Sequence, residues 1–192
     1  MFYRIARRLL IIFFRIIYRY NITGRENIPT TGPVILCSNH ISAMDPLMLI
    51  MLSKRQVHIM AKKELFEVRV LRTILRWAGA YPVDRAGAAD LKAYRHTLDI
   101  LNNEKVLGIF SQGTRTQEFD NVKGGVAVFA LKTGAPVIPV GIRGTYRLFS
   151  KINIHFGPPI SMEPYAGQKV KSALVETVME VITSQVSALA LQ

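Results

Sequence analysis

Apolar and polar positions alternate along the chain in a pattern that predicts strands followed by helices. Short β-branched or apolar runs predict buried strands, and apolar residues three or four positions apart predict helices. Strands are expected at 34–37, 57–61, 81–83, 106–110, 137–142 and 151–157, with a short extended piece at 20–27. Helices are expected at 45–52, 65–79, 88–102, 125–134 and 169–190. Asp45 is expected to cap the first of these helices, with Pro46 at its first helical position.

This alternation predicts an α/β fold, a single domain whose mixed, mostly parallel sheet is flanked by helices. The length of 192 residues is enough for one compact domain with its own core. No repeat, low-complexity tract or linker divides the chain. We therefore assign residues 1–20 to an amphipathic membrane-binding helix and residues 21–192 to the α/β domain.

The N-terminal segment MFYRIARRLLIIFFRIIYRY carries five arginines and no acidic residue. On a helix these arginines fall within an arc of about 120°, and Ile, Leu and Phe fill most of the remaining surface. The arginines interrupt the segment too often for a bilayer-spanning helix and recur too far along it for a signal peptide. The pattern predicts a helix in the plane of a membrane, with its arginines toward anionic phosphates. A helix that covers the protein core with a solvated arginine face is the alternative.

The net charge of the chain favours a polyanionic partner. Lys and Arg number 25 against 13 Asp and Glu, which gives a formal charge of +12. Nucleic acid, anionic lipid and an acidic carrier protein all fit such a charge. We expect no nucleic acid, because its binders interleave basic residues with exposed aromatic ones, whereas Phe13, Phe14 and Phe110 lie in apolar runs.

Three polar segments follow predicted strands: SNHISAMDP (38–46), DRAG (84–87) and SQGTRT (111–116). Ligand sites in parallel sheets gather beyond the carboxyl ends of the strands. We therefore expect the three segments to open onto one edge of the sheet.

His40 and Asp45 are candidate catalytic residues in the first of these segments. Histidine suits a general base near neutral pH, and an aspartate can hold one ring nitrogen so that the other faces a substrate. An aspartate before proline is also an ordinary helix cap, so both interpretations remain open from this loop alone. A thiol nucleophile at Cys37 with His40 as its base is a further alternative, although Cys37 ends a buried strand. Cys37 and His40 form only half of a zinc site, and no metal is expected.

The loop SQGTRT contributes candidate phosphate ligands. Gly113, Thr114 and Arg115 offer backbone and side-chain donors that suit a phosphate, and Arg85 and Lys123 can add positive charge. Each of these residues alone is also typical of a solvated surface. Their common position after successive strands favours a phosphate site.

These segments resemble the membrane glycerolipid acyltransferases of the N-H-x4-D type, in particular the 1-acylglycerol-3-phosphate acyltransferases. NHISAMD (39–45) matches the N-H-x4-D block, YPVDR (81–85) the second block, SQGTRT (111–116) the third and VIPVGI (137–142) the fourth. The four blocks stand in the order of the family and at compatible spacing. The resemblance therefore covers residues 39–142.

The resemblance implies transfer of an acyl chain from acyl-CoA or acyl-ACP to the sn-2 hydroxyl of lysophosphatidic acid, giving phosphatidic acid in phospholipid biosynthesis. It implies that His40 is the general base and that Asp45 orients it, with no acyl-enzyme. It implies no cofactor besides the acyl donor, and a peripheral or monotopic position on the cytoplasmic face of a membrane. The phosphate ligands that it implies are Arg85, Gly113, Thr114 and Arg115, with Lys123 as a helper. The further motif positions are Asn39, Gln112 and Pro139, the last of them structural or acyl-facing.

Gln112 departs from the family pattern, because many relatives have glutamate at this position of the third block. Glutamine keeps the hydrogen-bonding capacity and loses the negative charge. The retained His40, Asp45, Arg85 and Arg115 favour an active enzyme. The alternatives are an acyltransferase for another lysophospholipid or for glycerol phosphate, and a non-catalytic peripheral membrane-binding protein that keeps the fold.

Overall fold

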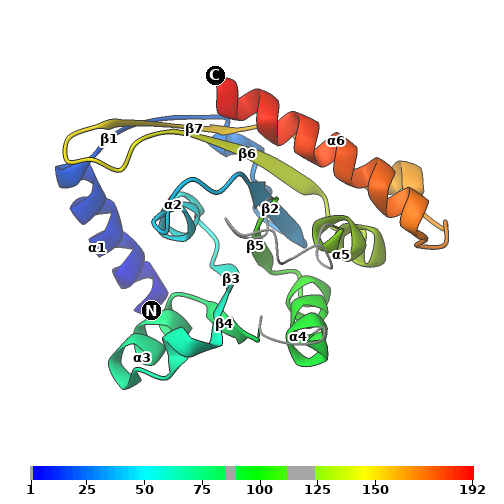
Figure 1. The fold of residues 1–192 in the computed structure, drawn as a ribbon, viewed down its shortest axis with the longest axis horizontal. Helices are drawn as coiled ribbons and strands as arrows, with labels where there is room; N and C mark the ends of the chain where they lie inside the picture. Colours follow the sequence, from blue (N-terminus) through cyan, green and yellow to red (C-terminus); the bar gives the residue numbers. More distant parts are fainter. Residues whose placement is uncertain (1, 85–89, 112–123) are drawn as a thin grey trace.

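The computed structural model describes residues 2–84, 90–111 and 124–192. Within these residues seven strands form one sheet (Figure 1). The strands are β1 (Arg19–Thr23), β2 (Val34–Ser38), β3 (Val57–Lys62), β4 (Ala80–Val83), β5 (Val106–Phe110), β6 (Val137–Gly144) and β7 (Lys151–Phe156). Their order across the sheet is β1-β7-β6-β2-β5-β3-β4, and every pairing is parallel except that of β6 with β7. The predicted mostly parallel mixed sheet is confirmed.

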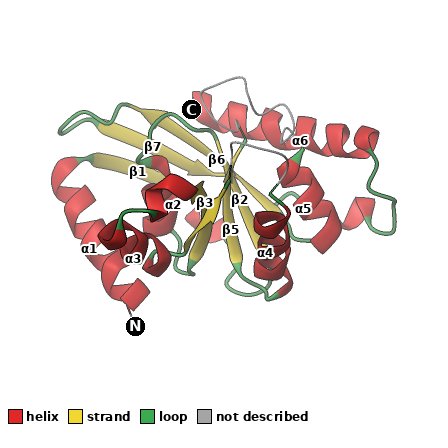
Figure 2. Ribbon diagram, turned by 60° about the horizontal axis from the view of Figure 1, so that its bottom comes forward, coloured by secondary structure: helices red, strands yellow, loops and turns green. Residues whose placement is uncertain are grey.

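Helices cover both faces of this sheet (Figures 1 and 2). One side carries α1 (Phe2–Ile17), α2 (Asp45–Leu52) and α3 (Arg69–Trp77), and the other carries α4 (Leu91–Asn102), α5 (Gly125–Thr133) and α6 (Ser172–Leu191). Side chains of β2 alternate between the two cores: Val34 and Leu36 face α1 and α2, whereas Ile35 and Cys37 face α4, α5 and α6. A strand buried on both faces needs an unbroken apolar run, which is why the sequence marks it clearly.

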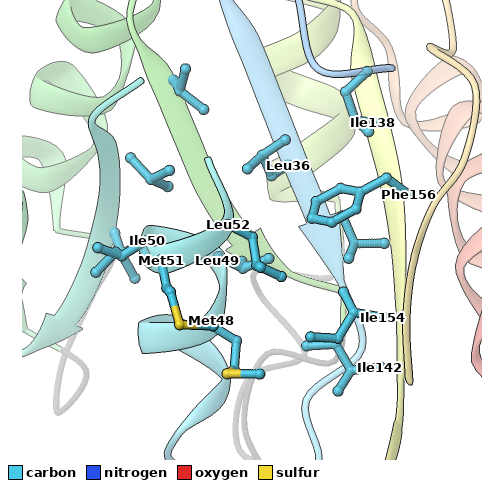
Figure 3. Close-up of a cluster of buried hydrophobic side chains, with 14 of the residues drawn as sticks. Leu36, Met48, Leu49, Ile50, Met51, Leu52, Ile138, Ile142, Ile154 and Phe156 are labelled. Carbon is cyan, nitrogen blue, oxygen red and sulfur yellow. The ribbon is translucent and has the colours of Figure 1, made fainter. Parts of the chain in front are cut away.

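Helix α2 sits over the middle of the sheet, next to the loop that follows β2. Its residues from Met48 to Leu52 are all buried. Figure 3 shows Met48, Leu49 and Leu52 against sheet side chains such as Ile142 and Ile154. This packing fixes the start of α2, and with it the loop 39–44.

Several elements have other bounds than the sequence predicts. The helix expected at 65–79 begins only at Arg69, because Lys63–Phe66 form a 3₁₀ turn that buries Phe66 and because Val68 has an extended backbone. The helix assigned to residues 1–20 ends at Ile17, and the chain continues as β1, which pairs with β7 at the edge of the sheet. Of the piece expected to be extended at 20–27, only 20–23 lie in β1, and Arg25–Asn27 form a 3₁₀ turn. Exposed and half-buried residues alternate along β1, so it carries little apolar signal.

Helix α6 is the one helix among the described residues that is long and apolar enough to cross a membrane by length and composition alone. Here one face of α6 packs on the sheet through the buried residues Val178, Ile182 and Val186. Gly141 of β6 allows this close approach: a Cβ there would lie 2.3 Å from the carbonyl carbon of Leu189. A larger residue at position 141 would push α6 away from the sheet.

Candidate active site

The carboxyl ends of β2 and β5 lie side by side, because the two strands are parallel neighbours. The N–H of Ser111, just past β5, donates to the carbonyl oxygen of Ser38 at the end of β2, at 2.8 Å. The first and third polar segments therefore begin at the same edge of the sheet, as predicted. Strand β4 runs in the same direction, and its carboxyl end points to this edge as well.

His40 and Asp45 form a hydrogen-bonded pair beyond β2. Nδ1 of His40 lies 2.8 Å from Oδ2 of Asp45, and the aspartate is fully buried whereas the histidine side chain is 24% exposed. The ring of Phe110 stacks on His40 with a centroid distance of 4.4 Å. Because Nδ1 is engaged by the carboxylate, Nε2 is the ring nitrogen left to take a proton from a substrate. The pair has the geometry of a general base and the group that orients it.

Both oxygens of the buried Asp45 carboxylate have hydrogen-bond donors. Oδ2 accepts from the N–H groups of Ile41 and Ser42, each at 2.7 Å, in addition to His40. Oδ1 accepts from the hydroxyl of Tyr146 at 2.6 Å. Four donors thus converge on one buried side chain and fix its position. Asp45 thus holds the loop and the imidazole at the same time.

The predicted role of Asp45 as helix cap is wrong. Met44 is the N-cap residue, without a side-chain cap bond, and Asp45 is the first residue of α2 with Pro46 after it. The carboxylate turns back toward the preceding loop, where its donors lie, rather than forward to the N–H groups of the helix. The carboxylate therefore accepts hydrogen bonds from the loop and the imidazole instead of capping the helix.

Asn39 fastens the loop to the neighbouring strand β6. Its side-chain Nδ2 donates to the carbonyl oxygen of Ile142 at 2.8 Å, and the N–H of Ile142 donates to its Oδ1 at 2.7 Å. This two-bond clamp positions the residue directly before His40. Pro139, also in β6, is buried, and its carbonyl oxygen accepts from the N–H of Gly157 at 2.8 Å. The placement of Pro139 favours the structural role over the acyl-facing one.

Tyr146 is a residue of this site that the sequence does not predict. It follows β6 and stands 101 positions from Asp45 in the chain. Its ring packs edge to face on Tyr18, with a centroid distance of 5.6 Å, and Tyr18 in turn packs on Phe14 of α1. Burial and the neighbouring Asp45 carboxylate raise the pKa of Tyr146 far above its usual value, so the hydroxyl remains a donor. The only signal in the sequence is a tyrosine shortly after the fourth block, and this does not predict its hydrogen bond to Asp45.

A model of the family described as Acyltransferase matches residues 19–143. The chain belongs to this family. The acyltransferase is 36% identical over 148 residues to the 1-acyl-sn-glycerol-3-phosphate acyltransferase of Borreliella burgdorferi, an alignment that covers 73% of this chain and 57% of that relative. It is 30% identical over 159 residues to the 1-acyl-sn-glycerol-3-phosphate acyltransferase of Bacillus subtilis, which covers 79% of this chain and 78% of that relative.

A solved structure shows the same fold as the acyltransferase. The crystal structure of the 1-acyl-sn-glycerophosphate (LPA) acyltransferase PlsC from Thermotoga maritima superposes with a TM-score of 0.69 at 23% identity. The match covers 100% of this chain and 79% of that chain. The resemblance found in residues 39–142 is thereby confirmed at the level of family and fold.

The predicted phosphate ligands of the acyltransferase fall outside the described residues. These ligands are Arg85, Gly113, Thr114, Arg115 and Lys123, and the motif position Gln112 lies outside the described residues as well. Their grouping around one phosphate stays a prediction.

Cys37 of the acyltransferase packs in the core rather than facing the site. Its side chain is fully buried on the face of β2 that packs against α4, α5 and α6. This burial raises the pKa of its thiol to about 12. A thiol with such a pKa supplies almost no thiolate at neutral pH. Cys37 is therefore a poor nucleophile. Among the residues that the structure describes, no group of three or more His, Cys, Asp and Glu side chains lies together to hold a metal ion.

Tyr146→Phe is expected to lower both activity and stability of the acyltransferase. The change keeps the ring on Tyr18 but leaves Oδ1 of buried Asp45 without its donor, a loss worth about 1–3 kcal/mol. A loss of about 1.4 kcal/mol in transition-state stabilisation lowers kcat roughly tenfold. Turnover and thermal unfolding check both effects.

The matched control is Tyr81→Phe, which removes a buried tyrosine hydroxyl bonded to Thr97 on the other face of the sheet. This variant is expected to lose stability with little change in kcat. Equal losses of kcat in the two variants would show that Tyr146 acts on the fold alone.

Proposed function

We propose that the protein transfers an acyl chain from an acyl thioester to the sn-2 hydroxyl of 1-acylglycerol-3-phosphate. The observation that carries this proposal is the His40–Asp45 pair at the carboxyl edge of the sheet, with one nitrogen of the ring engaged by a buried carboxylate. Family membership supports acyl transfer as the reaction. The two curated relatives named above are 1-acyl-sn-glycerol-3-phosphate acyltransferases, which supports lysophosphatidic acid as the acceptor.

His40 acts as the general base in this proposal. Its Nε2 takes the proton of the acceptor hydroxyl as the oxygen attacks the thioester carbonyl, and the Asp45 carboxylate stabilises the imidazolium that forms. The carbon–sulfur bond then breaks, and His40 returns the proton to the departing thiolate. The new ester and a free thiol are the products, and no covalent acyl-enzyme is involved. The buried Cys37 is consistent with this direct transfer.

The phosphate of the acceptor is proposed to bind Arg85, Gly113, Thr114 and Arg115, with Lys123 as a helper. Strands β4 and β5 support this grouping, because these parallel strands end at the edge that holds His40 and lead directly into the two motif segments. Gln112 would supply hydrogen bonds there without a charge. No cofactor besides acyl-CoA or acyl-ACP enters the proposal.

Arg115→Lys is expected to raise the half-saturating lysophosphatidic acid concentration about tenfold. Lysine keeps the charge but loses the planar, bidentate geometry of the guanidinium, and a hydrogen bond to a charged group contributes about 1.5–3 kcal/mol. The half-saturating concentration of the thioester should change less. The charge-matched control is Arg95→Lys, at an exposed position of α4. The same loss of acceptor affinity in both variants would remove Arg115 from the phosphate site.

Helix α1 is proposed to lie on an anionic membrane surface. Phe14 is buried, so one face of the helix packs on the core. Another face leaves four large apolar side chains more than half exposed, and Arg8 and Arg15 are exposed as well. These four are Leu9, Ile12, Phe13 and Ile16. We place the protein on the cytoplasmic face as a peripheral or monotopic protein, where acyl-CoA or acyl-ACP serves as donor.

The decisive experiment measures free thiol released from an acyl thioester by the full-length protein, with and without lysophosphatidic acid. We expect release that depends on lysophosphatidic acid and is matched by phosphatidic acid formed. Acyl-CoA and acyl-ACP are compared as donors, and lysophosphatidylcholine and glycerol 3-phosphate as acceptors. Faster release with another acceptor would assign the protein to a related acyltransferase. Vesicle binding without any thiol release would instead support the non-catalytic alternative.

A further inference from the structure

Helix α3 is amphipathic, and none of its nine residues is buried. Leu71 and Leu75 are half-buried where the helix packs beside β4. Val70 is 71% exposed, Ile74 53% and Trp77 51%. A soluble helix normally turns its apolar stripe toward the core. In α3 a second apolar stripe remains on the surface.

The exposed apolar stripe of α3 stands apart from a basic stripe on the same helix. Val70, Ile74 and Trp77 are spaced i, i+4 and i+7, so they line one side. At about 100° per residue, three arginines form a second stripe roughly 130° away. They are Arg69, Arg72 and Arg76, and the helix contains no acidic residue.

Helix α1 is organised in the same way. It has a core-facing side with Phe14, an arginine side, and an exposed apolar side that includes Ile12 and Ile16. Figures 1 and 2 both draw α3 beside the N-terminal end of α1, on the same side of the sheet. Two neighbouring helices thus each expose an apolar stripe and carry arginines on a different side.

The chemistry of this surface fits an anionic bilayer better than a protein partner or nucleic acid. Aliphatic side chains enter the acyl region, tryptophan prefers the headgroup level, and arginines pair with lipid phosphates. The segment 62–77 carries five basic and two acidic side chains, and one of the basic ones, Lys63, pairs with Asp84. Enough positive charge therefore remains to attract anionic headgroups.

We propose that α3 is a second membrane contact, which inserts Val70, Ile74 and Trp77 into the interface of an anionic bilayer beside α1. The proposal extends the proposed function, because a lipid acceptor requires a lipid surface. It assigns a contact to the β4 edge of the sheet, at the opposite end from β1. Two contacts hold a domain on a surface more firmly than one.

Trp77 gives a direct test, because it is the only tryptophan in the sequence. The full-length protein is mixed with vesicles of phosphatidylglycerol and phosphatidylcholine, and the tryptophan emission is recorded. We expect a blue shift and quenching by bromine-labelled acyl chains, both weaker with phosphatidylcholine alone. Vesicle binding that leaves the Trp77 emission and quenching unchanged would overturn the proposal, because α1 alone would then make the contact.

Substitutions give a second test that does not depend on Trp77. The double variant Val70→Glu/Ile74→Glu is expected to weaken partition onto the anionic vesicles at least about tenfold, because two aliphatic side chains no longer enter the apolar interface and two negative charges are added beside anionic lipid. Ile12→Glu/Ile16→Glu in α1 is the positive comparison. Leu91→Glu, at a position 64% exposed on the other side of the sheet, is the control and should bind as the parent does. Thermal unfolding confirms that each variant is folded.

Parent-like vesicle binding by the α3 variant would overturn the proposal. The proposal would also be overturned if the variant partitioned onto vesicles as the parent does but lost a protein contact that the parent makes. That contact could be self-association of the lipid-free protein or binding to acidic acyl carrier protein. None of these readouts uses acyl transfer. Failure of thiol release with lysophosphatidic acid would therefore count against the proposed function and leave the α3 contact standing, and the reverse also holds.

Discussion

His40→Ala is expected to abolish acyl transfer in a protein that remains folded. General-base help is worth about 10²- to 10⁴-fold, and no other described side chain is bonded to Asp45 in a position to replace the imidazole. The histidine is partly exposed, so its removal leaves no large cavity. The Asp45 carboxylate keeps its donors from Ile41, Ser42 and Tyr146. Thiol release and thermal unfolding measure the two expectations separately.

The matched control for this variant is His96→Ala, since His96 is an exposed histidine that packs on Tyr81 in the other layer of the fold. Its turnover should stay close to that of the parent. Near-parental turnover by His40→Ala would rule out the general-base mechanism. Cys37→Ser belongs in the same assay, and a folded but inactive Cys37 variant would restore the thiol nucleophile.

Asp45→Asn is expected to reduce turnover about 100-fold with a smaller loss of stability. The amide oxygen can take the place of Oδ2, because the N–H groups of Ile41 and Ser42 and Nδ1 of His40 all require an acceptor there. The amide nitrogen then faces the oxygen of Tyr146, which can accept a hydrogen bond. The geometry survives, but the negative charge that stabilises the imidazolium is lost.

Asp45→Ala separates the structural role of this residue from the chemical one. Alanine leaves several buried donors without an acceptor, each at a cost of about 1–3 kcal/mol, so the melting temperature should fall much further than for Asp45→Asn. Equal melting temperatures of the two variants, or parental turnover of Asp45→Asn, would contradict this account of the carboxylate.

Much of the fold is predictable from sequence because its central strands are buried on both faces. Strand β5 coincides with the predicted 106–110, and β2 extends the predicted 34–37 by one residue. The edge strand β1 is harder to predict, since exposed residues alternate with half-buried ones along it. The start of α3 is also shifted, because burial of Phe66 in a 3₁₀ turn is a tertiary effect that periodicity does not show.

The proposed catalytic pair, His40 and Asp45, is predictable because its two members are close in sequence and belong to one motif. Their hydrogen bond needs only a short loop between β2 and α2. Tyr146 is different, since its bond to Asp45 depends on how β6 is placed beside β2 in the sheet. Whether Asp45 caps its helix or turns back is likewise decided by donors that only the folded loop brings together.

The burial of Phe14 has a consequence for how the protein meets a surface. Only Tyr18 separates α1 from β1, and this tyrosine packs on Phe14 and Tyr146, so helix and sheet are rigidly joined. A flexible tether raises only the local concentration of a protein near its target. A rigidly attached helix would also fix the orientation of the domain and the height of His40 above a membrane that the helix binds. Under the proposed membrane contact, the protein would then prefer acceptors whose hydroxyl group lies at the height of His40 above the bilayer.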